Sequence, residues 1–136
     1  MNPIDLNGLW AIRRESAEAL SLSLDRFLET ATAEKIEEIA ARMAAAPAPA
    51  PIPYEVQGDG IAVLQIEGML TSKPVVSWWG EQRGTTYGQI LSGVRDAQKD
   101  PAVKSIVLAW DSPGGTVDGT KEAADAVAEV VADGKP

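Results

Sequence analysis

Residues 104–119 read KSIVLAWDSPGGTVDG, an apolar run that ends in a glycine turn. Residues 105–110 are rich in strand formers, which predicts a buried central strand of a parallel sheet. Pro113 has no N–H for a sheet ladder, and Gly114 and Gly115 permit positive φ angles and leave the backbone uncovered. We therefore expect bare amide groups at the carboxyl end of the sheet, where open α/β sheets bind ligands.

The segment after this turn, residues 116–132, has a helical composition, so the turn is expected between a strand end and a helix start. Two adjacent amides at that place can stabilise a developing oxyanion or bind an anion. Pro-Gly-Gly after a strand is also a common ordinary turn. The residues by themselves leave both interpretations open.

The chain resembles the signal-peptide-peptidase-A-like serine peptidases, and most of all their phage and prophage capsid-maturation branch. The resemblance rests on DPAVKSIVL (residues 100–108) and DSPGG (residues 111–115), followed by Val117 and Gly119. It covers residues 54–136, with a fainter likeness around Trp10-Ala11-Ile12 and the helix after it. It implies an α/β, Clp protease/crotonase-like fold, in which ββα units build a parallel sheet with flanking helices, here incomplete.

The resemblance also implies roles for the glycine turn. In this family the Ser-Pro-Gly-Gly turn is not the nucleophile; Gly114 or Gly115 would donate an amide to the oxyanion hole. Thr116 and Val117 would hold a polypeptide substrate as an added strand. The family's nucleophilic serine and general-base lysine come later than the position of Pro136. We therefore expect the sequence as given to be the N-terminal part of a Ser-Lys endopeptidase, inactive alone.

Local residues are poor substitutes for the missing dyad. Ser112 precedes a proline, where a short hydroxyl commonly closes a turn, although it stays a candidate nucleophile. Lys104 and Lys121 flank the turn in polar surroundings, whereas a general base needs desolvation that lowers the lysine pKa. Asp111 and Asp118 are most simply explained by capping and solvation, with a carboxylate pair as the alternative.

Composition excludes several classes of function. The 136 residues are 45% hydrophobic and carry a net charge of −8, which argues against nucleic acid and anionic membranes as partners. The chain has no cysteine or histidine, so thiol catalysis, a Ser-His-Asp triad, and cysteine and imidazole metal ligands are absent from it. We expect no cofactor and no metal. No apolar window is long enough to span a membrane, and we expect a cytoplasmic protein, in the host cytoplasm if phage-encoded.

Three regions are expected along the chain: an N-terminal helical extension (1–46), an Ala/Pro linker (47–53) and the N-terminal part of the peptidase domain (54–136). Ser16 is expected to cap the first helix, and a second helix opens near Thr32. The alternating prolines of the linker favour an extended, semi-rigid spacer. A ligand for an SH3-like partner is the alternative for that segment.

The third region predicts alternating strands and helices. An edge strand is expected at 54–57, a buried strand at 61–66 and a helix that begins at Thr85 or Thr86 and ends at Asp100-Pro101. Such alternation favours a parallel sheet with right-handed crossovers.

Two further features of this region are expected from side-chain patterns. Adjacent Trp78 and Trp79 face opposite ways in an extended chain, so one is expected to be exposed, at an interface or on a substrate-side wall. A packed loop is the alternative for this segment. The last helix is expected to turn four residues inward: Ala123, Val127, Val130 and Val131.

The expected partners follow from these assignments. A polypeptide is the expected substrate, and a capsid or scaffold protein is a candidate partner. A homo-oligomer is expected because an incomplete sheet leaves a strand edge and apolar surface uncovered. Two alternatives stay open: a noncatalytic assembly or scaffold-interaction module, and a crotonase-type acyl-CoA enzyme, whose paired glycine amides surround a thioester oxygen.

Overall fold

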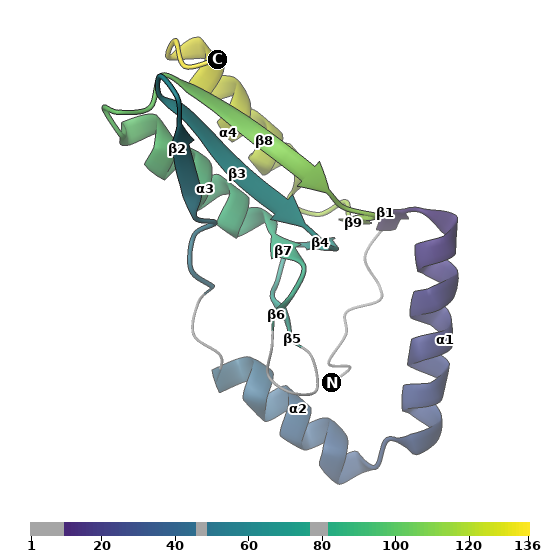
Figure 1. Ribbon diagram of the computed structural model, residues 1–136. Helices are drawn as coiled ribbons and strands as arrows, with labels where there is room; N and C mark the ends of the chain where they lie inside the picture. The colour runs from purple at the N-terminus through teal and green to yellow at the C-terminus, as the bar shows by residue number, and fades with distance from the viewer. Residues whose placement is uncertain (1–9, 46–48, 77–81) are drawn as a thin grey trace.

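The computed structural model describes residues 10–45, 49–76 and 82–136, and it is a mixed α/β structure (Figure 1). Trp78 and Trp79, and the first two linker residues, lie outside these ranges. One sheet has the order β2-β3-β8 and a second the order β1-β9-β4-β7. Their strands are β2 (Tyr54–Gln57), β3 (Ile61–Glu67), β8 (Ser105–Asp111), β1 (Trp10–Ile12), β9 (Gly114–Thr116), β4 (Leu70–Thr71) and β7 (Thr85–Thr86). Strand β5 (Val75–Val76) pairs antiparallel with β6 (Gln82–Arg83).

The first sheet confirms the predicted strands and their parallel pairing. Strand β3 is antiparallel to β2 and parallel to β8, in a register that runs from Ile61 opposite Ser105 to Glu67 opposite Asp111. The expectation that residues 105–110 form a buried central strand is wrong for the described chain. Strand β8 lies at an edge of its sheet, and Val107 and Trp110 are 46% and 54% exposed.

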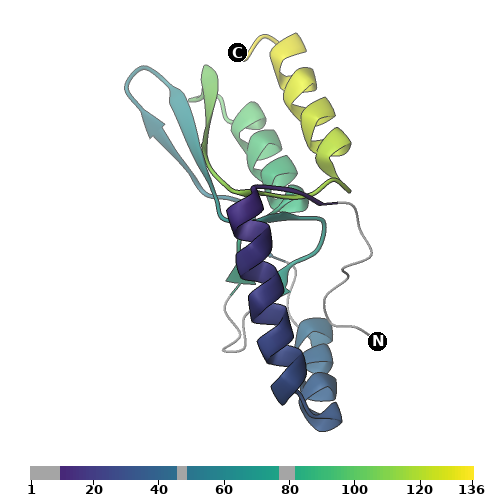
Figure 2. The same cartoon turned by 90° about the vertical axis from the view of Figure 1, so that its right-hand side faces the viewer.

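The core lies between this sheet and two helices, α3 (Tyr87–Lys99) and α4 (Thr120–Ala132). Figure 2 shows both helices on the same face of the sheet, while the other face is open. Alternate residues of β3 point into this core, so Ala62, Leu64 and Ile66 are fully buried while their neighbours are not. Helix α3 covers them with Ile90 and Val94. The apolar strand β8 is therefore covered by helices on one face of the sheet and exposed on the other.

Helix α3 begins where the sequence predicts. The Thr86 hydroxyl accepts the Gln89 N–H at 3.2 Å, and the Gln89 side chain accepts the Thr86 N–H at 3.0 Å, a reciprocal capping box. The Gln89 amide also donates to the Ala50 carbonyl at 2.9 Å. Ile52, next along the linker, is buried in the core against α3. The end of the Ala/Pro segment is therefore packed against the domain rather than acting only as a spacer.

The N-terminal helices are α1 (Arg14–Thr30) and α2 (Ala33–Ala45), and both extend away from the two sheets (Figures 1 and 2). The expectation that Ser16 caps the first helix is wrong. The helix starts three residues earlier, and its N-cap residue Arg13 makes no side-chain capping bond. The start of the second helix just after Thr32 is confirmed. Neither helix contains a buried residue.

The last helix differs from its predicted start and inward face. It begins at Thr120 rather than at residue 116, because Gly114–Thr116 pairs as strand β9. Gly119 precedes it with a φ of +92°, a conformation that favours glycine. Val131, expected inward, is 56% exposed. The buried residues of α4 are Ala123, Ala126 and Val130, as spacings of three and four residues require.

Asp100 and Lys135 close the end of α3. The Asp100 carboxylate accepts the Ala102 N–H at 2.8 Å and the Tyr54 hydroxyl at 2.9 Å. These two hydrogen bonds, with the nearby Lys135 charge, hold the pKa of Asp100 below its ordinary value of 3.8. The Lys135 ammonium donates to the Asp100 carbonyl at 2.8 Å, at the helix end that favours a cation.

The Asp100 contacts predict a specific acid sensitivity. A carboxyl whose folded pKa is lowered stabilises the fold above its unfolded pKa and loses that contribution as pH falls through the folded pKa. Asp100→Asn should therefore flatten the fall in Tm on acidification below pH 3.8, relative to the unchanged chain. Asp59→Asn, in the exposed β2–β3 turn, is the control and should keep the unchanged profile. Identical profiles for Asp100→Asn and the unchanged chain would contradict this assignment.

Candidate functional site

The glycine turn follows β8 and leads into β9. Its first residue, Ser112, accepts the Gly114 N–H at 3.1 Å through its hydroxyl, and the same hydroxyl donates to the Gly114 carbonyl at 3.3 Å. The Pro113 carbonyl accepts the Arg13 N–H at 2.9 Å. Ser112 thus closes the turn on backbone groups, the structural role that its position before a proline predicts.

Both glycines are required by the close approach of neighbouring backbones. A Cβ on Gly115 would lie 1.8 Å from the Leu70 carbonyl oxygen of β4. A Cβ on Gly114 would lie 2.0 Å from the Ala11 carbonyl oxygen of β1, and Gly114 has a φ of +110°. Any larger residue would separate the strands. The two glycines therefore allow β9 to fit between β1 and β4.

The glycine amides have partners within the chain. Gly114 donates to Ser112, as described above. Ala11 stands opposite Gly115 in the antiparallel β1–β9 pair, and the bonded Arg13–Pro113 pair lies two positions away. Because bonded pairs alternate along an antiparallel ladder, the Gly115 N–H faces the Ala11 carbonyl. That either amide donates to a ligand oxygen stays a prediction.

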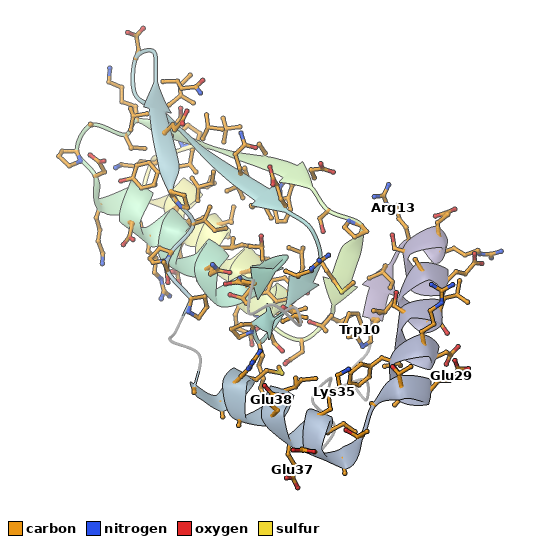
Figure 3. All side chains as sticks on the ribbon, turned by 60° about the horizontal axis from the view of Figure 1, so that its bottom comes forward. Trp10, Arg13, Glu29, Lys35, Glu37 and Glu38 are labelled. Atoms are coloured by element: carbon orange, nitrogen blue, oxygen red, sulfur yellow. The ribbon has the colours of Figure 1, made fainter. Side chains whose placement is uncertain are left out.

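Thr116 and Val117, the expected substrate-binding residues, follow directly. Thr116 is half-buried and stands opposite Trp10 of β1, so the edge expected to receive a substrate strand is occupied by the N-terminal strand. Val117 lies past the end of β9 and is 41% exposed. Figure 3 labels Trp10, the first residue of β1, and Arg13, which follows β1 at the start of α1.

Sequence reasoning missed Tyr87, which positions the segment after β9. Tyr87 is 7% exposed, and its hydroxyl donates to the Thr116 carbonyl at 2.5 Å and accepts from the Thr120 hydroxyl at 3.1 Å. Its ring packs so closely on Gly119 that a Cβ there would lie 2.7 Å away. The available signal was an aromatic residue with a polar tip just after a predicted cap.

The lysines near the turn do not form a dyad with Ser112. Lys104 and Ser112 flank opposite ends of the seven-residue strand β8, a separation of about 26 Å along an extended chain. Lys121 pairs with Asp125 on the exposed side of α4. The hydrogen bond to that carboxylate raises the pKa of Lys121 above its ordinary value, the opposite of what a general base requires.

Asp111 and Asp118 take part in the turn through their backbones. The Asp111 carbonyl accepts the Gly68 N–H at 2.9 Å, and the Asp118 carbonyl lies 3.5 Å from the Thr116 hydroxyl. Neither contact uses a carboxylate. In the part of the chain that the structure describes, no three acidic side chains gather as a metal-binding set.

An apolar pocket of about 180 Å³ lies between strand β8 and helices α3 and α4. Leu108 and Trp110 of β8 form one wall and Ala123 and Val127 of α4 another. It is lined by Leu70, Tyr87, Ile90, Leu108, Trp110, Thr120, Ala123, Ala124 and Val127. Its lining suits aliphatic groups rather than charged ones.

Among the helices of the described residues, none has the length and hydropathy needed to cross a bilayer.

Comparison with known proteins shows a partial similarity to a phage protein. No family model matches the chain. The chain is similar to capsid assembly protease C of Escherichia phage lambda, with 38% identity over 78 residues. The match covers 57% of this chain and 17% of the phage lambda protein. This partial similarity supports a relation to a phage capsid protease. The predicted Clp protease/crotonase-like fold stays a prediction.

Substitution of Gly115 tests the geometry of the turn. Gly115→Ala should lower the free energy of unfolding by at least about 2 kcal/mol, because the new methyl would overlap the Leu70 carbonyl. Gly88→Ala, whose Cβ would meet nothing closer than 3.9 Å on helix α3, is the matched control and should raise stability by up to about 1 kcal/mol. Chemical denaturation measures both. Equal stability of Gly115→Ala and the unchanged chain would show that β9 does not fit between its neighbours as described.

Proposed function

We propose that this chain forms the oxyanion-donating and peptide-binding part of a Ser-Lys serine peptidase that acts in phage capsid maturation. The observation that carries the proposal is the paired-glycine strand β9 at the carboxyl end of β8. The partial similarity to a capsid assembly protease supports the reaction class. The proposal includes the Clp protease/crotonase-like arrangement and a capsid or scaffold polypeptide as substrate.

The chemistry assigns β9 two tasks. When a serine oxygen attacks a peptide carbonyl, the carbonyl oxygen becomes an oxyanion, and a positioned N–H stabilises it. Loss of one such donor typically slows the reaction about 10²- to 10³-fold. Gly114 or Gly115 supplies this donor, and Thr116 and Val117 bind the extended substrate through backbone hydrogen bonds. Strand addition of this kind needs an uncovered strand edge.

The nucleophile and general base are assigned to residues other than those of the turn. The Ser112 hydroxyl is bonded to both the N–H and the carbonyl of Gly114. Lys104 lies at the far end of β8, and Lys121 is held in its charged form by Asp125. The chain's own contribution is therefore binding and electrostatic stabilisation, with activity dependent on a serine and a lysine located elsewhere.

A second candidate function is assembly without catalysis, acting as a scaffold-interaction module or homo-oligomer. One observation favours it: α1 and α2 contain no buried residue, although apolar side chains recur along both. Leu22 and Leu28 of α1 are 65% and 57% exposed. Long helices with uncovered apolar side chains suit contacts with other proteins.

Fluorophosphonate labelling tests the proposed peptidase. The protein isolated from its native source should be labelled on a serine other than Ser112. Ser112→Ala should slow labelling by less than about tenfold, because it removes one turn hydrogen bond and not the nucleophile. Ser92→Ala, exposed on α3, is the control and should leave labelling unchanged.

Two outcomes would count against the proposal. Complete loss of labelling in Ser112→Ala would make Ser112 the nucleophile and reverse the assignment of the turn. No serine labelling at all, in a preparation that still forms oligomers, would favour the assembly module. Cleavage of a capsid or scaffold polypeptide by the labelled protein is the expected companion result.

A further inference from the structure

The outer edge of strand β9 is covered by the chain's own N-terminal strand. In the second sheet β9 is parallel to β4 on one side and antiparallel to β1 on the other. Figure 1 shows β1 beside β9, at the start of the long helix α1. The strand at the glycine turn therefore already has an extended polypeptide segment bound along it.

This segment pairs with β9 as a bound peptide would pair at the proposed oxyanion donor. Trp10 stands opposite Thr116, Ala11 opposite Gly115 and Ile12 opposite Gly114. The alternation of bonded pairs directs the Gly115 N–H to the Ala11 carbonyl. The Ala11 carbonyl thus lies where a substrate carbonyl would meet a glycine amide of the turn.

We propose that Trp10–Ile12 is an internal occupant of the peptide-binding edge of β9, which an external extended polypeptide displaces on binding. This inference rests on the proposed function for the identity of the edge as a substrate site. It adds that the edge is closed in the resting chain, and that the N-terminal strand competes with the substrate.

The N-terminal segment can be released from β9 without disrupting the core of the domain. No residue of β1, α1 or α2 is buried, and the core cluster draws all its residues from the linker onward. Strand β1 has three residues. Its release therefore breaks a short ladder and the contacts of two half-buried side chains, and the core between the first sheet and its helices stays intact.

The side chains of Trp10–Ile12 also indicate which external polypeptides would fit the edge of β9. Trp10 and Ile12 are half-buried, whereas Ala11 between them is exposed. Successive side chains of a strand face opposite ways, so the protein contacts the first and third positions and leaves the middle one free. The matching external ligand is an extended segment with apolar side chains on either side of a variable residue, bound antiparallel to β9.

A reversible disulfide tests the competition in the full chain. The chain has no cysteine, and Trp10 and Thr116 form a non-bonded antiparallel pair, a kind whose Cα atoms lie about 4.5 Å apart and within disulfide range. The double variant Trp10→Cys with Thr116→Cys should lock β1 on the edge when oxidised. The probe is a fluorescein-labelled peptide LWAIRR, the sequence of residues 9–14. Its affinity should be at least tenfold lower for the oxidised form than for the reduced form.

A second pair of variants does not need the disulfide. Ala11→Pro removes the N–H that faces the Gly115 carbonyl, while Ala11→Val keeps it and changes only an exposed side chain. Hydrogen exchange of the Gly115 amide should be at least tenfold faster in Ala11→Pro and unchanged in Ala11→Val. LWAIRR should bind Ala11→Pro at least tenfold more tightly than Ala11→Val, and the peptide LWPIRR should bind neither.

Equal peptide binding by the oxidised and reduced forms would overturn the inference, as would equal exchange in the two Ala11 variants. These readouts do not depend on catalysis. If the protein binds the peptide as expected but is never labelled by fluorophosphonate, the result supports the internal occupant as a binding property and contradicts the proposed peptidase activity. If the protein is labelled but the variants do not differ in peptide binding or hydrogen exchange, the result supports the peptidase activity and contradicts the internal occupant.

Discussion

The close contact of Gly115 with its two neighbouring strands is the constraint on which the rest of the site depends. The Leu70 carbonyl of β4 occupies the place where a Cβ would lie, and Ala11 of β1 stands on the opposite side. A sheet that joins residues about 10, 70 and 115 can form only because a residue without a side chain stands at their meeting point. Ser112 and Tyr87 then hold the two ends of β9 by hydrogen bonds to Gly114 and Thr116.

This small sheet is fixed to the larger one by contacts at the carboxyl ends of β3 and β8. The Gly68 N–H donates to the Asp111 carbonyl at 2.9 Å, and the Thr85 hydroxyl donates to the Glu67 carbonyl at 2.9 Å. Thr85 is buried, so this bond is protected from water. The turn is thereby positioned by the core, while α1 and α2 contribute no buried residue to it. The core therefore holds the edge of β9 in place, while β1 on that edge is attached by its short ladder.

The sequence predicts those features that depend on local patterns. Alternation and composition correctly indicate β3, β8 and their parallel pairing, and a threonine before an apolar period correctly indicates the cap at Thr86. The later start of α4 was not predicted, because Gly114–Thr116 is held as a strand by partners about 45 and 100 residues away. Propensity gives no sign of such pairings. The role of Tyr87 was missed for the same reason, since its partner is 29 residues away.

The most direct measurement of this account is the solution NMR spectrum of the chain, examined for contacts between β1 and β9. Ile12 with Gly114 and Trp10 with Thr116 are the non-bonded pairs of this ladder, in which the Cα atoms approach to about 4.5 Å. The account predicts strong Hα–Hα cross-peaks for both pairs. Absence of both, in a spectrum that retains the contacts between β3 and β8, would contradict the claim that the glycine-turn edge is occupied by the N-terminal strand.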